Sequence, residues 1–335
     1  AADRGNVIVS GTARIHLGVS NTINATIYGD FVVSAANLNA SYITSTGTAV
    51  VNIYGDLRLT NSSARLRLGA GGSTGNSILN LYGDFINQGG RLDETGDNPT
   101  QGTLNFVKNG TQTFSNQGVI VGRINYYIGP TTTLEVGNSL LSGSSPATFT
   151  LEGTIVLGSL DSYGAIHSSA NRGNIRTAPA YRTFAPGSTI VYGGAGEQFM
   201  SNGHPLNDEI TTVIRNSSGV KLVANTTIAG TLNLDEGSLD LNGRTLTLTG
   251  IVASNGGFLA GTPTSELIIN GSPGSAVTLA FDPSANALGK ITMNRADGTV
   301  SLTNTLVVAS SLNLNRGIIV TNNNLTLRNN VLVLR

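Results

Sequence analysis

The chain has 335 residues, no cysteine, and 19 basic against 19 acidic residues, so its formal net charge is zero. The missing cysteines exclude disulfides, thiolate metal sites and cysteine nucleophiles. The balanced charge argues against a nucleic-acid partner, because nucleic-acid binders are usually basic, and it removes a repulsion that keeps copies apart. Since no apolar run is long enough for a transmembrane helix, we expect neither nucleic-acid binding nor membrane insertion.

Short alternating segments make up the first third of the chain. Apolar residues occupy every second position in "RIHLG", "AVVNIYGDLRLT" and "ARLRLG", which is the pattern of half-buried strands. Clusters of Gly, Asn, Asp and Ser separate these segments and supply turns. The nearest helix candidate, "SNGHPLNDEITTVIRNSS" (201–218), is weakened by Pro205 and by its β-branched residues. The pattern therefore predicts an almost helix-free, all-β chain.

A four-residue motif occurs three times in this region. "IYGD" occupies 27–30 and 53–56, and "LYGD" occupies 81–84, so the tyrosines are 26 and then 28 residues apart. If the apolar residue before each tyrosine faces inward, the alternation turns the tyrosines outward. Each aspartate then follows a bend, where its carboxylate can accept backbone N–H groups. The motif predicts a corner repeated over three turns, with a contact ladder of Tyr28, Tyr54, Tyr82, Asp30, Asp56 and Asp84.

Two longer repeats follow. "AGTLNLDEGSLDLNGRTLTLTG" aligns with "ASSLNLNRGIIVTNNNLTLRN", so that Leu232 and Leu312 are equivalent and 80 residues apart. "GTLNFVKNGTQTF" resembles "GSTIVYGGAGEQF", which places Gln112 and Gln198 86 residues apart. Self-similarity at a fixed period is the signature of a repeat architecture.

Periods of 26–28 residues within units of about 80 predict a right-handed parallel β-helix, or β-solenoid, with roughly three turns per unit. Each turn would lie about 4.8 Å from the one before it. The alternative is a set of tandem β-sandwich domains, which would show frequent turn signals without a longer period. The solenoid interpretation divides the chain into an N-terminal segment with the motif, a middle unit and two repeat units, at 1–101, 102–183, 184–262 and 263–335.

Two segments carry a resemblance to a known family. "FAPGSTIVYGGAGEQF" (184–199) and "NSSGVKLVANTTIAGTLNLDEGSLDLNGRTLTLTG" (216–250) resemble the repeat of very large secreted surface proteins of the Bacteroidota. Those β-repeat proteins are generally exported by the type IX pathway and serve as adhesins or cell-surface filaments. The resemblance covers about 102–335 and implies an extracellular or cell-surface location. Because no C-terminal sorting domain is present, it also implies a segment of a longer chain, or a chain whose ends are covered by neighbours.

Candidate catalytic and metal-binding residues are few. The three histidines match no metal-ligand spacing; they are His16, His167 and His204. A glycosidase needs two convergent carboxylates, but adjacent acids in a strand point to opposite faces, as in Asp208/Glu209 and Asp235/Glu236. A loop with Asp93, Glu94 and Asp97 could bind Ca²⁺, although it lacks the EF-hand pattern, and a solvated loop is the simpler interpretation. We therefore expect no enzyme activity, no cofactor and no metal.

These observations predict a structural segment of an extracellular filament or cell-surface adhesin that mediates assembly and attachment. We expect self-association as a homo-oligomer or filament, because neither end carries a segment that would blunt an exposed strand. Cell-surface glycans or other cells are further expected partners. Two alternatives stay open: a β-helical polysaccharide-degrading enzyme, and a carbohydrate-binding module in which the tyrosine ladder stacks on sugars. Tyrosines in register more often stabilise neighbouring strands.

Overall fold

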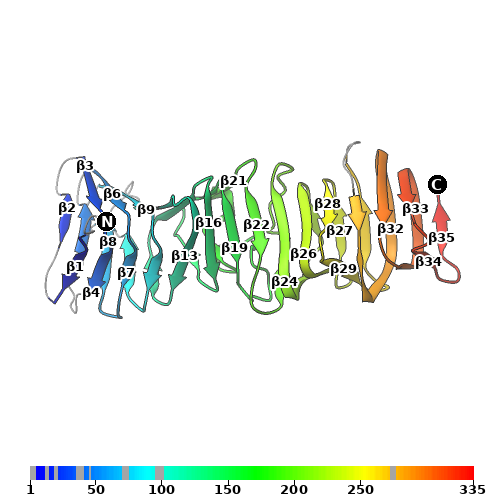
Figure 1. The fold of residues 1–335 in the computed structure, drawn as a ribbon, viewed down its shortest axis with the longest axis horizontal. Coiled ribbons are helices and arrows are strands. Elements are labelled where there is room, and N and C mark those ends of the chain that lie inside the picture. The colour runs from blue at the N-terminus through cyan, green and yellow to red at the C-terminus, as the bar shows by residue number, and fades with distance from the viewer. Residues whose placement is uncertain are drawn as a thin grey trace. The chain divides into compact units, whose positions relative to one another are not determined.

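The computed structural model describes residues 5–11, 15–18, 22–34, 41–44, 47–69, 75–94, 102–271 and 277–335. It is all-β: about 59% of the chain is strand, and parallel strands stack as a β-solenoid of about 13 turns (Figure 1). Within the described residues the only helical element is a 3-10 turn at Pro179–Tyr181. The predicted β-solenoid is confirmed, and the tandem β-sandwich alternative is wrong, because sandwiches consist of antiparallel sheets.

Two compact units make up the chain. Unit 1 comprises 1–155 and 174–183, and unit 2 comprises 156–173 and 184–335. The chain passes between the units within β19 (Thr154–Leu157), between Gly173 and Asn174, and within β21 (Arg182–Phe184). Each unit has its own set of buried apolar residues.

Unit 1 winds through three parallel sheets, with one strand per turn in each. The first sheet contains β3 (Ile23–Ile27), β6 (Thr48–Ile53), β9 (Asn76–Leu81), β12 (Gly102–Phe106), β15 (Ile124–Ile128) and β18 (Phe149–Leu151). The second contains β1 (Val7–Ser10), β4 (Phe31–Ser34), β7 (Leu57–Leu59), β10 (Phe85–Asn87), β13 (Gly110–Asn116) and β16 (Thr132–Gly137). The third contains β2 (His16–Gly18), β5 (Ser41–Thr44), β8 (Arg65–Gly69), β11 (Arg91–Glu94) and β14 (Val119–Val121). A separate pair joins β17 (Leu141–Ser142) to β20 (Ile175–Arg176).

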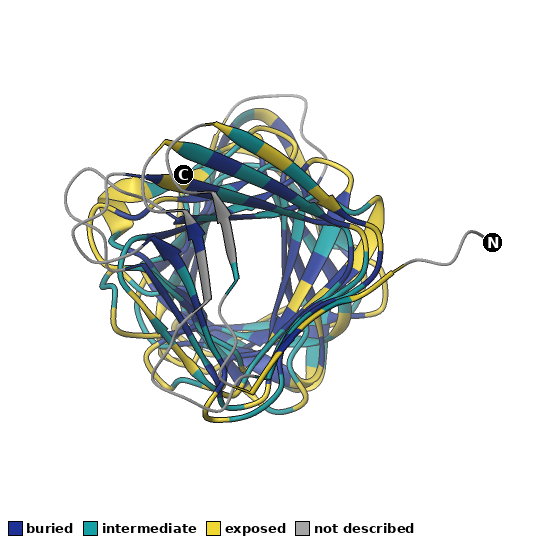
Figure 2. Ribbon diagram, turned by 90° about the vertical axis from the view of Figure 1, so that its left-hand side faces the viewer, coloured by how far each residue is buried: buried dark blue, intermediate teal, exposed yellow. Residues whose placement is uncertain are grey.

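The core of unit 1 consists of the inward residues of these strands. Ile27, Ile53 and Leu81 are in register on successive turns, and all three are buried. Leu57 and Phe85 are likewise in register and have no exposed surface. Buried and less buried positions alternate along the strands (Figure 2), so the inward and outward faces predicted from the motif are confirmed. Each such side chain contributes about 2 kcal/mol of burial free energy.

Unit 2 has three faces as well, and several of its strands continue around a corner. Its first face contains β22 (Thr189–Tyr192), β28 (Val252–Ser254), β31 (Val277–Leu279) and the first halves of β24 (Thr211–Leu222) and β26 (Thr231–Asp240). Its second contains β23 (Gln198–Met200), β29 (Phe258–Gly261), β34 (Leu325–Leu327) and the second halves of β24 and β26. Its third contains β25 (Thr226–Ile228), β27 (Thr245–Leu248), β30 (Glu266–Ile269) and β35 (Leu332–Leu334). The long strands β32 (Phe281–Leu302) and β33 (Leu306–Val320) contribute to all three faces.

The sequence predicts roughly three turns for the 80-residue repeat. In the structure the repeat does not span three whole turns. On one face, Leu232 pairs with Val252, Val252 with Val277, and Val277 with Val300. Leu312 pairs instead with Ile291, on a different face. The turns of unit 2 are shorter than those around the motif, so a span of 80 residues ends on a different face from the one on which it began.

The 86-residue repeat predicts local geometry more closely. Gln112 in unit 1 and Gln198 in unit 2 are both completely buried. Each donates from Nε2 to two backbone carbonyls of the preceding turn, at 2.9 and 2.5 Å for Gln112 and at 3.1 and 3.4 Å for Gln198. Each also accepts the backbone N–H four residues earlier, at 3.1 and 2.7 Å respectively. One buried carboxamide thus satisfies three backbone groups at a corner, which explains why glutamine recurs there.

Candidate functional site

The tyrosines of the repeated motif form a stack on the outside of unit 1. The ring centroids of Tyr28 and Tyr54 are 5.6 Å apart with an interplanar angle of 14°, and those of Tyr54 and Tyr82 are 4.5 Å apart with an angle of 8°. Both faces of the Tyr54 ring are therefore covered by neighbouring rings, although Tyr28 and Tyr54 are exposed. A sugar that stacks on an aromatic residue needs an open ring face. The stack offers mainly ring edges, which disfavours the sugar platform that the sequence left open.

The aspartates of the motif link successive turns through the backbone. The Asp56 N–H donates to Asp30 Oδ1 at 2.9 Å, and the Asp84 N–H donates to Asp56 Oδ1 at 2.8 Å. The series extends in both directions, since Asn6 Oδ1 accepts from the Asp30 N–H and Asp84 Oδ1 accepts from the Thr113 N–H. Each carboxylate satisfies the corner of the next turn, which is the role that the sequence assigned to these residues.

Arg58 reduces the repulsion within the aspartate series. Its Nε lies 3.4 Å from Asp30 Oδ2, and its Nη2 lies 2.5 Å from Asp56 Oδ2. These side chains are partly exposed, so the ion pairs contribute little free energy by themselves. The sequence places Arg58 on the outward face, two residues after the second motif aspartate, but does not predict these ion pairs.

A second ladder of amides runs beside the tyrosines. Asn80 Nδ2 donates to Asn52 Oδ1 at 2.9 Å, and Asn105 Nδ2 donates to Asn80 Oδ1 at 2.8 Å. Asn52 and Asn80 stand two residues before their motif tyrosines, on the same outward face. That repeated spacing could have predicted the ladder.

The motif glycine is required by the close approach of successive turns. A Cβ at Gly83 would lie 2.1 Å from the Gly55 carbonyl oxygen, and a Cβ at Gly55 would lie 2.4 Å from the Gly29 carbonyl oxygen. Any larger residue would push neighbouring turns apart at this corner. Tyrosine, glycine and aspartate together hold the spacing of the stack.

The acidic residues considered for Ca²⁺ are arranged differently from a metal site. Asp93 is completely buried, and Arg65, Arg67 and Arg91 surround its carboxylate. Guanidinium groups in those positions repel a cation. Asp97, the third acid of the expected site, lies outside the described residues. We conclude that Asp93 belongs to a charge cluster on the third sheet of unit 1.

The other acidic candidates among the described residues are exposed or bonded to an amide. Asp208 and Glu209 are exposed, and Asp235 bonds to the amide of Asn255 at 3.0 Å. The "GGSTG" segment (71–75) has the GxSxG spacing of a nucleophile elbow. Strand β9 follows it where an elbow requires a helix, and residues 70–74 lie outside the described residues.

The two histidines whose side chains are described each have local partners. His204 is 3% exposed; its Nδ1 lies 3.2 Å from Tyr192 Oη, and its Nε2 lies 2.9 Å from Thr212 Oγ1. Burial lowers the pKa of His204 to about 4, so the ring is neutral near pH 7. His167 contacts the hydroxyl of Ser169. Nothing is described of the His16 side chain. The surroundings of His204 are those of a buried, hydrogen-bonded structural residue.

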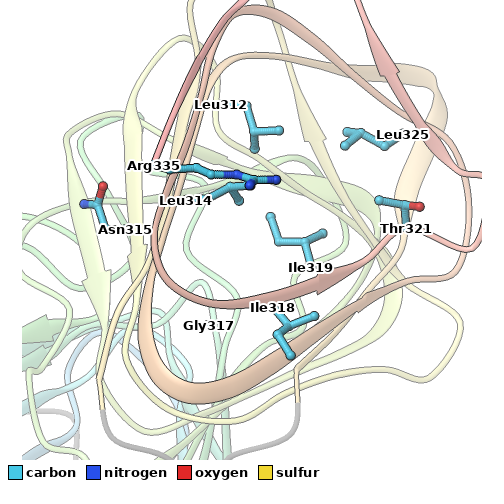
Figure 3. Close-up of a pocket in the computed structure, with 9 residues that line it drawn as sticks. All are labelled: Leu312, Leu314, Asn315, Gly317, Ile318, Ile319, Thr321, Leu325 and Arg335. Atoms are coloured by element: carbon cyan, nitrogen blue, oxygen red, sulfur yellow. The ribbon is translucent and has the colours of Figure 1, made fainter.

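A hollow of about 480 Å³ lies in the last turns of unit 2. It is lined mainly by apolar residues of β33 and includes Leu325 and Arg335, and Figure 3 shows the Arg335 side chain reaching across it beside Leu314. Among the described residues that line it, Arg335 has the only ionisable side chain. The hollow therefore has no acid–base pair for catalysis.

Comparisons with known proteins leave the function to be inferred from the geometry. No family model, curated protein or solved structure matches the chain. In the described part of the chain no helix has the length and apolar character to cross a membrane. Among those same residues, no three His, Asp or Glu side chains lie close enough together to hold a metal ion.

Proposed function

We propose that this chain is a structural segment of an extracellular filament or cell-surface adhesin, in which the stacked turns bear load and the outer faces make contacts. The supporting observation is that the motif residues link one turn to the next. The Asp30–Asp56–Asp84 series and the tyrosine stack both run across successive turns. Side chains in such series resist sliding and separation of the turns, which is a mechanical role.

The composition supports a role in assembly. The net charge is zero, so no long-range repulsion opposes contact between copies. Charged residues are only 11% of the chain, and two of the outward ladders of unit 1 consist of neutral amides and phenols. Such surfaces can pack against copies of themselves without desolvating charge.

Electron microscopy and sedimentation velocity at micromolar concentration test the assembly. We expect fibres or large oligomers, and beads coated with the protein should be retained on cell or glycan surfaces. Beads coated with the core variant Leu57→Asp, in which folding is disrupted, serve as the control. A protein that remains monomeric throughout the concentration range and whose beads are not retained would contradict the proposal.

A further inference from the structure

A cluster of charges lies on the outer face of the third sheet of unit 1. Strands β8 and β11 place Arg65, Arg67, Arg91 and Asp93 outward, because buried leucines occupy the alternate positions. Arg65 is in register with Arg91 on the next turn, and Arg67 is in register with Asp93. The four side chains therefore occupy two adjacent turns, about 5 Å apart.

Asp93 is at the centre of this cluster. Its carboxylate accepts two bonds from Arg65, at 2.5 and 3.3 Å, and lies 3.5 and 3.4 Å from the Nε atoms of Arg67 and Arg91. Within this cluster three guanidinium groups share the single carboxylate of Asp93. A second anion would lower the repulsion among guanidinium groups held this close together.

The cluster is open to an incoming ligand on one side. The Arg91 side chain is 41% exposed. On the next turn, Val119 and Val121 are in register with Arg91 and Asp93, and both valines are exposed, Val119 by 50%. A ligand that reaches Arg91 would therefore rest against an apolar strip rather than against another charge.

We propose that this surface, the arginine face (Arg65, Arg67, Arg91, Val119 and Val121), binds an acidic polysaccharide through a carboxylate or sulfate group. A guanidinium group is a planar fork that matches such anions with two parallel hydrogen bonds, and the valines can pack against the carbon-bound face of a sugar ring. Strand β11 is paired on both sides, with β8 and β14, so its backbone has no free edge for an acidic peptide to join. The inference rests on the proposed adhesin function and names its ligand class.

Binding of the full chain to immobilised polygalacturonate and chondroitin sulfate tests this assignment, with dextran and poly-glutamate as comparison surfaces. We expect binding to the two acidic glycans, none to dextran, and a loss of about fivefold in affinity for Arg91→Gln. Arg58→Gln is the matched control, because its side chain is 38% exposed but lies on the second sheet. Its affinity should stay within about twofold of the unmodified protein.

Substitutions at Val119 keep the test independent of the salt-bridge cluster. Val119 is exposed, so Val119→Lys and Val119→Asp should both fold, as circular dichroism melting would verify. The lysine should strengthen glycan binding and the aspartate should weaken it. Equal binding by the two Val119 variants, equal losses for Arg91→Gln and Arg58→Gln, absence of glycan binding, or stronger binding to poly-glutamate would each overturn the assignment. Fibre formation by the same samples, followed by microscopy, reports separately on the proposed function.

Discussion

The motif corner of unit 1 and the interior of unit 2 differ in where they place the polar groups that join successive turns. In unit 1 the carboxylates of Asp30 and Asp56 lie on the outside and are partly exposed. In unit 2, His204 is buried in a network of hydroxyl groups. Arg295 is completely buried there too, and donates to the carbonyl oxygens of two earlier turns, at 3.0 and 2.8 Å.

This difference indicates how much stability each region loses when one hydrogen bond is removed. When an exposed bond is removed, water replaces the missing partner, and the free energy of unfolding changes little. When a buried bond is removed, the remaining polar group has no partner and the cost is larger. We therefore expect the motif corner of unit 1 to depend mainly on its apolar core, and the buried polar groups of unit 2, like Gln112 in unit 1, to contribute more to the free energy of unfolding.

The largest effect should come from charging the core of unit 1. Leu57 has no exposed surface, so Leu57→Asp buries an unpaired carboxylate and should lower the free energy of unfolding by about 4 kcal/mol. The neighbouring Arg58→Gln removes only partly exposed ion pairs and should cost about 0.5 kcal/mol. Urea unfolding measures both variants. The opposite ranking would show that the two faces of β7 have been exchanged.

The buried histidine should make unit 2 sensitive to acid. The pKa of His204 is lowered by burial from 6.5 to about 4. Between these pH values the unfolded chain binds a proton that the folded chain does not, so the free energy of unfolding decreases as the pH falls, by about 3 kcal/mol at pH 4. Carboxylates titrate in part of this range, so the informative quantity is the difference from His204→Gln. If both proteins lose stability equally between pH 6.5 and 5, His204 does not carry this effect.

The equivalent glutamines should have equal effects in the two units. Gln112→Leu and Gln198→Leu each leave three buried backbone groups without their side-chain partner, so each should cost about 2 kcal/mol. Thermal melting of the two variants provides the comparison. A large loss for one and none for the other would mean that the repeat does not preserve the role of the residue.

The smallest expected effect belongs to the tyrosine stack. Tyr54→Leu keeps an apolar group on the surface but removes two ring contacts, which should cost about 1 kcal/mol. Tyr181 is similarly exposed and lies in the 3-10 turn, so Tyr181→Leu is the control and should change stability less. No difference between the two variants in thermal melts would indicate that the stack contributes nothing to stability.

The sequence predicts those features that depend on alternation within one turn. The inward position of Leu57 and the bend at Gly83 both follow from local spacing, and the structure places them accordingly. It does not predict which residues meet across turns, because that depends on the length of every turn between them. For this reason the salt bridges of Asp93, and the shift of Leu312 to another face, became visible only in the fold.

The central claim is that stability depends on the register between turns, and deletion of one whole turn tests it most directly. Asp235 and Asn255 are 20 residues apart on neighbouring turns, so removal of residues 235–254 joins Leu234 to Asn255 and preserves each face. Removal of residues 235–244 shifts all later strands by half a turn. In circular dichroism melts, we expect the first variant to unfold cooperatively near the temperature of the intact protein, and the second to lose that transition. Equal melting of the two variants, or loss of folding only in the first, would contradict the account.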